Sequence, residues 1–171
     1  MNRALIAYIF GFIAYLFLQV IVLRNIIVFD TAFCFAYIVF LLMLPVETAT
    51  INLLFIAMLM GISVDTFYDS LGVHAASSVF IMFIRNGWLK LLTPQGGYDP
   101  GVRPVISLNG FSWFIVYSVP LIFIHHTLIF YIEAGGFHLF GYTLLKVVFS
   151  TLLTALVIVL LQYIFPVKGR L

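Results

Sequence analysis

Long runs without charge decide what this chain can fold into. The first of them, Ala4 to Leu23, holds no Asp, Glu, Lys or Arg, and similar runs follow along the chain. A helix of about 20 apolar residues is long enough to cross the hydrocarbon of a bilayer. Of the 171 residues, 64% are hydrophobic and 8% are charged, whereas about a quarter of an average soluble domain is charged. The chain is therefore expected to be an integral membrane protein.

Six stretches are predicted to form transmembrane helices that pack as one compact all-α bundle. They cover residues 4–23, 31–44, 50–64, 73–92, 111–131 and 142–165. The second stretch is the shortest, and Pro45 ends it because proline fixes φ and removes a backbone donor. The polar stretch 93–109 is expected outside the hydrocarbon, because its prolines and glycines prevent a continuous helix. The length corresponds to a single domain, residues 1–171.

Six crossings place both chain ends on the same side of the membrane. That side then collects most of the basic residues, namely Arg3, Lys90, Arg103, Lys168 and Arg170. Arg24 and Lys146 fall on the opposite side. Since cytoplasmic loops are enriched in Lys and Arg, both termini are predicted to be cytoplasmic. The connectors 24–30, 65–72 and 133–138 are then expected to face outside.

Ionisable side chains inside apolar runs are the candidates for function, because a charge in the membrane is costly unless it is used. Under the predicted topology most of them fall in the outer half of the bundle. The candidate partner-binding or intramembrane polar residues are Asp65, Asp69, His74, Arg85, His125, His126 and Glu133. Three interpretations stay open. In the first, these residues mark span ends and hydrogen-bond one another or water. In the second they form a protein-contact surface, and in the third they line an ion or proton path.

Spacing limits what these residues can form. Asp65 and Asp69 are four apart, so they share one face if the helix continues through them. His125 and His126 point about 100° apart on a helix, so both cannot easily face one ligand. The two histidines are adjacent, so they lack the i, i+4 spacing with which one helix supplies two imidazoles to zinc. We expect no metal, no cofactor and no enzymatic activity, because the sequence contains neither a phosphate loop nor a catalytic constellation.

Arg85 lies well inside its predicted span, and two arrangements are open for it. In the first arrangement, its side chain extends toward the cytoplasmic headgroups beside Lys90, and the aliphatic stem covers apolar surface. Alternatively, it is buried and paired with Glu47 or with a neighbouring helix, as is usual for a charge inside a bundle.

Four segments carry a recognisable pattern. They are residues 44–48 (LPVET), 61–76 (GISVDTFYDSLGVHAA), 91–99 (LLTPQGGYD) and the pair His125-His126. The most specific part is the core Gly-x-x-x-Asp-x-x-x-Asp-x-Leu-Gly-x-His-Ala of the second segment. Together these segments resemble the rod shape-determining protein MreD family, and the resemblance covers nearly the whole chain.

The resemblance implies a non-enzymatic, multi-pass component of the bacterial elongation complex in the cytoplasmic (inner) membrane. Such a protein binds MreC, works with the MreB filament and the peptidoglycan synthases, and supports cell shape and lateral peptidoglycan synthesis. It contacts membrane lipids and no nucleic acid. Asp65, Asp69 and His74 would then help form an outward-facing surface on which MreC docks. In the competing interpretation the aspartates cap helix ends and stabilise the fold.

A second class of function stays open. The vitamin-binding S components of energy-coupling-factor transporters are also six-helix membrane proteins of this size, and MreD resembles them in architecture. The chain would be a small-molecule binding subunit of a membrane transporter if several of its polar groups converge in a concave pocket.

Overall fold

The computed structural model describes residues 3–166, and nearly all of its regular structure is helical. The N-terminal helix is α1, Arg3–Phe17, continued by a π-helical turn, η1, Leu18–Val22, and a 3-10 turn, η2, Leu23–Asn25. A two-stranded antiparallel hairpin follows, made of β1, Ile27–Val28, and β2, Ala32–Phe33. The remaining helices are α2, Ile38–Leu42; α3, Thr50–Tyr68; α4, Val73–Leu91; α5, Ile106–Asn109; α6, Phe111–Glu133; and α7, Phe140–Ile164.

Within this part of the chain, four helical segments are long and apolar enough to cross a membrane. They are Leu5–Asn25, Thr50–Tyr68, Phe111–Glu133 and Phe140–Ile164. This finding confirms a mainly helical protein of membrane type. The helix α4 is present where it was predicted but is not among the four, and its interior face carries the polar side chains of His74, Ser77, Ser78 and Arg85.

The predicted helix over residues 31–44 is wrong. The strand β2 covers only residues 32–33, residues 36–37 form a turn, and only the five residues of α2 are α-helical. Apart from Phe33, which is half-buried, residues 32–44 are buried. We call residues 32–37 the strap. Non-helical backbone is tolerated at membrane depth only where protein satisfies its hydrogen bonds, and the strap has such partners in the surrounding helices.

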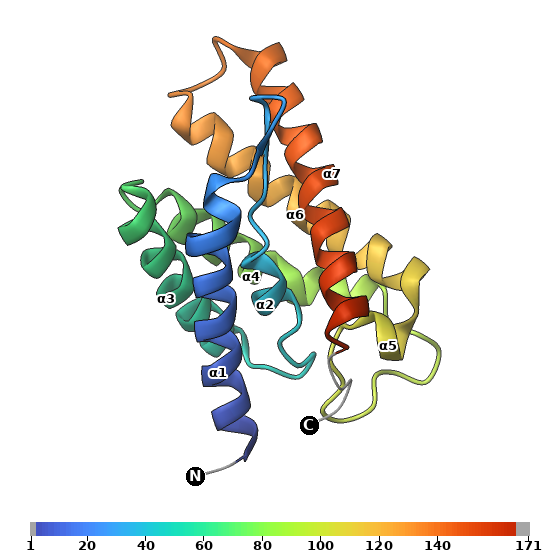
Figure 1. Cartoon of the computed structure of the whole chain (residues 1–171). Coiled ribbons are helices and arrows are strands. Elements are labelled where there is room, and N and C mark those ends of the chain that lie inside the picture. Colours follow the sequence, from blue (N-terminus) through green and yellow to red (C-terminus); the bar gives the residue numbers. More distant parts are fainter. Residues whose placement is uncertain (1–2, 167–171) are drawn as a thin grey trace.

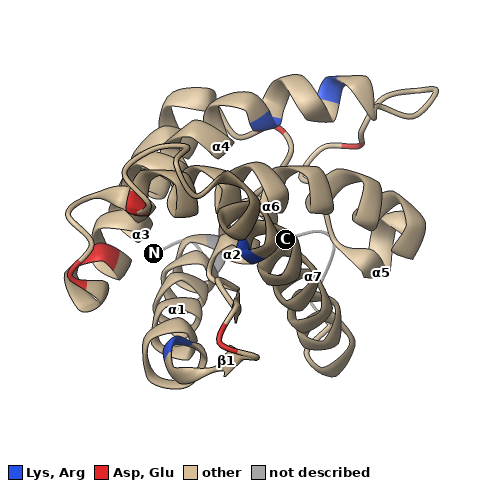
Figure 2. Ribbon diagram, turned by 90° about the horizontal axis from the view of Figure 1, so that it is seen from above, with Lys and Arg blue, Asp and Glu red and all other residues tan. Residues whose placement is uncertain are grey.

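The helices lie around the strap and α2, and α4 and α6 run obliquely to α1 and α7 (Figure 1 and Figure 2). The start of α1 and the end of α7 lie at the lower end of the molecule in this view, whereas the β1–β2 hairpin and the α6–α7 connection lie at the upper end. Charged positions are sparse on the ribbon, and blue positions on α4 mark basic residues within a helix (Figure 2). The core is therefore built around a mostly non-helical segment instead of a sixth long helix.

Glycine allows α3 and α4 to approach each other unusually closely. A Cβ atom added to Gly61 would lie 2.3 Å from Ala75 Cα, 2.6 Å from Ala75 N and 2.8 Å from His74 O. Small residues at helix interfaces allow this kind of close packing inside membranes. The contact places the end of α3 directly beside the first turn of α4.

Candidate functional site

The side chain of Asp65 caps α4 from the preceding helix. Its Oδ1 accepts the backbone N–H of His74 at 3.0 Å, and its Oδ2 accepts the N–H of Ala75 at 2.9 Å. The first N–H groups of a helix have no partner within the helix and are usually capped by the residue at its start. Here that residue is Gly72, which has no side chain. Asp65 therefore supplies the cap.

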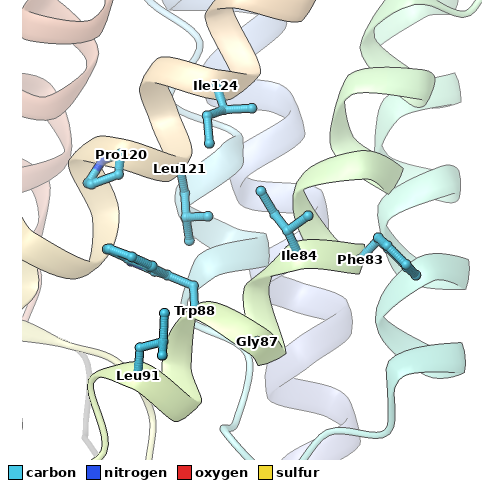
Figure 3. A pocket seen from close by; sticks show the side chains of 8 residues that line it. All are labelled: Phe83, Ile84, Gly87, Trp88, Leu91, Pro120, Leu121 and Ile124. Carbon is cyan, nitrogen blue, oxygen red and sulfur yellow. The ribbon is translucent and has the colours of Figure 1, made fainter.

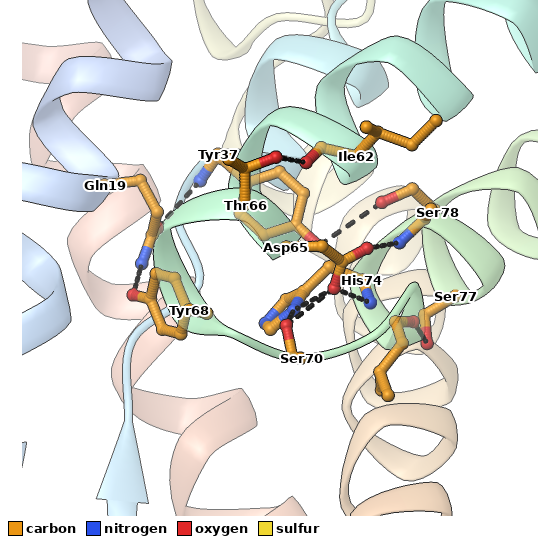
Figure 4. Close-up of polar contacts among 12 residues, drawn as sticks. Gln19, Tyr37, Ile62, Asp65, Thr66, Tyr68, Ser70, His74, Ser77 and Ser78 are labelled. Atoms are coloured by element: carbon orange, nitrogen blue, oxygen red, sulfur yellow. Dashed lines mark hydrogen bonds and ion pairs between the residues drawn. The ribbon is translucent and has the colours of Figure 1, made fainter.

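The same carboxylate organises two further side chains (Figure 4). Ser70 donates its hydroxyl to Asp65 Oδ1 at 2.6 Å, and His74 Nδ1 lies 3.1 Å from that oxygen. Because a carboxylate oxygen accepts, the hydrogen of a neutral His74 is on Nδ1. His74 Nε2 is then an acceptor, and it has no hydrogen-bond partner among the described residues.

Asp69 is not part of this cluster. The helix α3 ends at Tyr68, and Asp69 adopts a left-handed conformation with φ 55°. Its side chain is exposed, whereas Asp65 is 7% exposed and His74 is fully buried. The two aspartates therefore do not share a helical face, and the expected outward-facing surface does not include His74. The capping interpretation describes Asp65 better.

His125 and His126 both point into the bundle and are fully buried. His125 Nε2 lies 2.8 Å from the hydroxyl of Tyr37, which also lies 3.2 Å from Ser78 Oγ. His126 Nδ1 donates to the carbonyl of Ile122 at 2.8 Å, so its Nε2 accepts the hydroxyl of Thr154 at 3.0 Å. The second nitrogen of His125, Nδ1, has no partner within residues 3–166.

The three buried histidines meet around one side chain of the strap. The ring centroid of Phe35 lies 5.2 Å from that of His74, 6.4 Å from His125 and 5.4 Å from His126. His125 and His126 thus both contact one ring of the strap. An aromatic ring that approaches the helix can contact both imidazoles, although they leave the backbone in different directions.

Side chains of the surrounding helices accept the backbone hydrogen bonds of the strap that a neighbouring strand would otherwise accept. Its alternate amide groups point to polar side chains: the N–H of Phe33 donates to Ser150 Oγ at 2.9 Å, and that of Phe35 to Thr154 Oγ1 at 3.1 Å. The N–H of Tyr37 donates to Gln19 Oε1 at 3.2 Å. The period of two is that of an extended chain. Ser150 and Thr154, four residues apart, lie on one face of α7.

Gln19 completes this arrangement from the π-helical turn of α1. Its Nε2 donates to the carbonyl of Cys34 at 2.9 Å and to the hydroxyl of Tyr68 at 2.7 Å. The side chain is fully buried, and π-helical turns inside α-helices are frequent at functional sites. Gln19 thus binds one residue of α3 and two of the strap.

Arg85 is fully buried, whereas Lys90 on the same helix is exposed. Its Nε donates to the hydroxyl of Tyr117 at 2.8 Å, and its Nη2 donates to the carbonyls of Leu42, at 3.3 Å, and Leu44. These carbonyls lie at the C-terminal end of α2 and just beyond it, where the helix dipole favours a cation. Of the two arrangements considered, Arg85 adopts the buried one, and backbone carbonyls take the place expected for Glu47.

Arg103 binds the same end of α2, donating from Nε to the carbonyl of Met43 at 3.0 Å. Glu133, in contrast, is exposed at the end of α6 and does not join the histidine cluster. Sequence reasoning did not identify Phe35, Tyr37, Tyr117 or Thr154 as part of an internal site. The one available signal was the i, i+4 pair of hydroxyl residues on α7.

No group of three or more His, Cys, Asp or Glu side chains within residues 3–166 is placed to hold a metal ion. A surface hollow of about 490 Å³ lies between α4 and α6 beside Pro120 (Figure 3). Its lining is almost entirely apolar, and Trp88 donates its indole N–H to the carbonyl of Tyr117 at 3.1 Å. This hollow faces away from the polar interior and offers little for a polar ligand.

No family model, curated protein or solved structure matches the chain. The residues of the site are therefore interpreted from their own geometry.

Proposed function

We propose that the chain is a non-enzymatic component of a bacterial elongation complex of the MreD type. In this proposal it crosses the cytoplasmic membrane six times, with α1, the strap and α2, α3, α4, α6 and α7 as the crossings and both termini in the cytoplasm. This six-crossing bundle would share its architecture with the S components of energy-coupling-factor transporters. MreC is its direct partner, and MreB and the peptidoglycan synthases are indirect partners.

One observation carries the proposal. The stretch 61–76, on which the resemblance chiefly rests, forms a single structural unit, the α3–α4 hairpin, in which Gly61 provides the close approach and Asp65 the helix cap. The side chains of Asp65 and Ser70 and the Nδ1 of His74 are bound to backbone or to one another, whereas Asp69 is exposed. Such an arrangement suits a scaffold that presents a rigid end to a partner better than it suits a catalyst, which needs groups free to react.

The tip of this hairpin is the surface proposed for MreC. Asp69 and Leu71 are both exposed there, with relative exposure of 103% for Leu71. Both have a left-handed backbone, with φ of 55° and 43°. A hollow of about 360 Å³ lies beside them, and Thr66 also lines it. An exposed apolar side chain next to an unburied acid suits a protein contact that combines apolar burial with charge.

The test is a pull-down of MreC with the double variant Asp69→Asn, Leu71→Asn. Asn tolerates the left-handed conformation, so the variant should reach the wild-type membrane level and lose most of the retained MreC. A matched control exists in the β1–β2 turn, where Phe29 and Asp30 are also exposed with φ of 53° and 54°. Phe29→Asn with Asp30→Asn should retain MreC. Full retention of MreC by the variant Asp69→Asn, Leu71→Asn would refute the proposed surface.

The alternative, a vitamin-type binding subunit of a transporter, is favoured by one feature, the convergence of buried polar groups around the strap. A thermal-shift screen of the purified protein against vitamins tests it. A saturable shift at low micromolar ligand would favour the transporter over the elongation complex.

A further inference from the structure

The environment of Phe35 does not fit the side chain that occupies it. Its benzyl ring, 4% exposed, lies among three imidazoles, and Tyr68 and Phe130 complete the wall at centroid distances of 6.1 and 6.0 Å. Two of the three imidazoles have a ring nitrogen without a partner in the described part of the chain. Buried polar atoms are nearly always hydrogen-bonded. An apolar ring cannot provide those bonds.

The hydrogen positions on the imidazoles decide what the two unpartnered nitrogens can bind. His74 Nε2 is an acceptor, because the hydrogen of the neutral ring is on the nitrogen that faces Asp65. The hydroxyl of Tyr37 lies between Ser78 Oγ and His125 Nε2. When Ser78 donates to this hydroxyl and the hydroxyl donates to Nε2, the hydrogen of His125 is on the unpartnered Nδ1. The imidazoles that contact Phe35 then carry one unpartnered acceptor and one unpartnered donor.

The strap that carries Phe35 is attached in a way that can be released. Its amides are held by three separate side chains and not by a continuous ladder, and only two residue pairs join β1 to β2. The turn between these strands contains two consecutive non-glycine residues with positive φ, Phe29 and Asp30. Such conformations are strained and are common in segments that switch.

We propose that Phe35 occupies an internal binding site for a small planar heteroaromatic molecule, and that outward displacement of the strap opens it. The ligand ring takes the place of the benzyl group, donates to His74 Nε2 and accepts from His125 Nδ1. The ring of Phe35 competes with the ligand for this site, and its local concentration is high because the chain holds it there. The site is therefore closed until the ligand displaces the ring. This inference is independent of membership in the elongation complex, and its test does not involve MreC.

The first test uses Phe35→Ala, which removes the ring, with 2-pyridone as the probe. This neutral molecule has the size of the lost ring and carries one N–H donor and one carbonyl acceptor. Its apolar counterpart is toluene. In the purified variant, 2-pyridone should raise the melting temperature saturably and bind about tenfold tighter than toluene, as expected for buried hydrogen bonds.

Two controls separate this site from an ordinary cavity. Phe114→Ala removes an equally buried ring, 1% exposed, from a part of the core next to Tyr117, and it should show no preference for 2-pyridone. Adding His125→Phe to Phe35→Ala should abolish the preference. Equal binding of 2-pyridone and toluene by Phe35→Ala, or the same response in Phe114→Ala, would refute the site.

The second test uses the wild-type protein, so it does not depend on the folding of a variant. Cys34, the only cysteine, is 2% exposed and adjoins Phe35 in the strap. Its reaction with methyl methanethiosulfonate reports the opening of the strap. A concentration of 2-pyridone that displaces Phe35 should speed the reaction about tenfold. An unchanged rate at the highest soluble concentration would refute the displacement of the strap.

Discussion

Asp65, in the last turn of α3, accepts the backbone N–H of Ala75, in the first turn of α4, at 2.9 Å. The two residues are ten apart in sequence, yet this bond and the one to His74 replace a local helix cap. The connection between α3 and α4 is therefore held by a carboxylate that the bilayer would otherwise disfavour.

Asp65→Asn should destabilise the protein by about 1–3 kcal/mol, because one of the two oxygens that accept backbone N–H groups becomes an NH₂ donor. Thermal and denaturant unfolding in detergent measure the loss. Asp69→Asn is the matched control, since Asp69 is exposed and Asn tolerates its left-handed backbone. Equal stability of the two variants would contradict the capping role.

Gly61→Ala should lower stability by about 1–3 kcal/mol or more, because its Cβ would collide with the backbone of Ala75 and force the helices apart. Gly87→Ala makes the same change in α4, at a position with open space around it in the described structure. It should be neutral or stabilising, since alanine is the better helix former. A tolerated Gly61→Ala would show that the close approach of α3 and α4 is not needed.

Arg85→Ala should reduce the folded yield sharply, with a cost of about 3 kcal/mol, because the carbonyls of Leu42 and Leu44 lose a charged donor in a buried site. Lys90→Ala, on the same helix but exposed, should leave yield and melting temperature unchanged. If both variants behave alike, Arg85 is not buried in the membrane-embedded protein and the snorkelling arrangement is correct.

The proposed orientation predicts a labelling pattern in intact spheroplasts. In a Cys34→Ala background, cysteines introduced at Thr66 and Gly135 should react with an impermeant maleimide, and a cysteine at Gly97 should not. All three positions are exposed, so differences in burial do not explain the pattern. Labelling at Gly97 alone would reverse the orientation inferred from the basic residues.

The apolar runs predicted five of the six expected helices to within a few residues, because length and hydrophobicity are enough to define a helix that faces lipid. The sixth expectation, over residues 31–44, failed because an equally apolar run can be non-helical when it is fully enclosed. What decided its conformation lies far away in sequence. Ser150 and Thr154 bind the strap across more than 100 residues.

The candidate site was predicted in part. Asp65 and His74 were expected to lie close together, and they do, but they were placed on an outer surface. That placement assumed a helix continuing to Asp69, whereas the left-handed conformation of Asp69 ends α3 and turns the chain back. The role of Phe35 could not be predicted, because an apolar residue in an apolar run carries no local signal of its neighbours.

The central claim is that side chains of η1 and α7 accept the backbone hydrogen bonds of the strap that a neighbouring strand would otherwise accept. Residue-resolved amide hydrogen exchange of the purified protein tests it most directly. The amides of Phe33, Phe35 and Tyr37 should exchange as slowly as those of α3, and Thr154→Val should speed exchange at Phe35 about tenfold or more while Phe33 changes less. Rapid exchange at all three amides in the wild type, or unchanged protection of Phe35 in Thr154→Val, would contradict the claim.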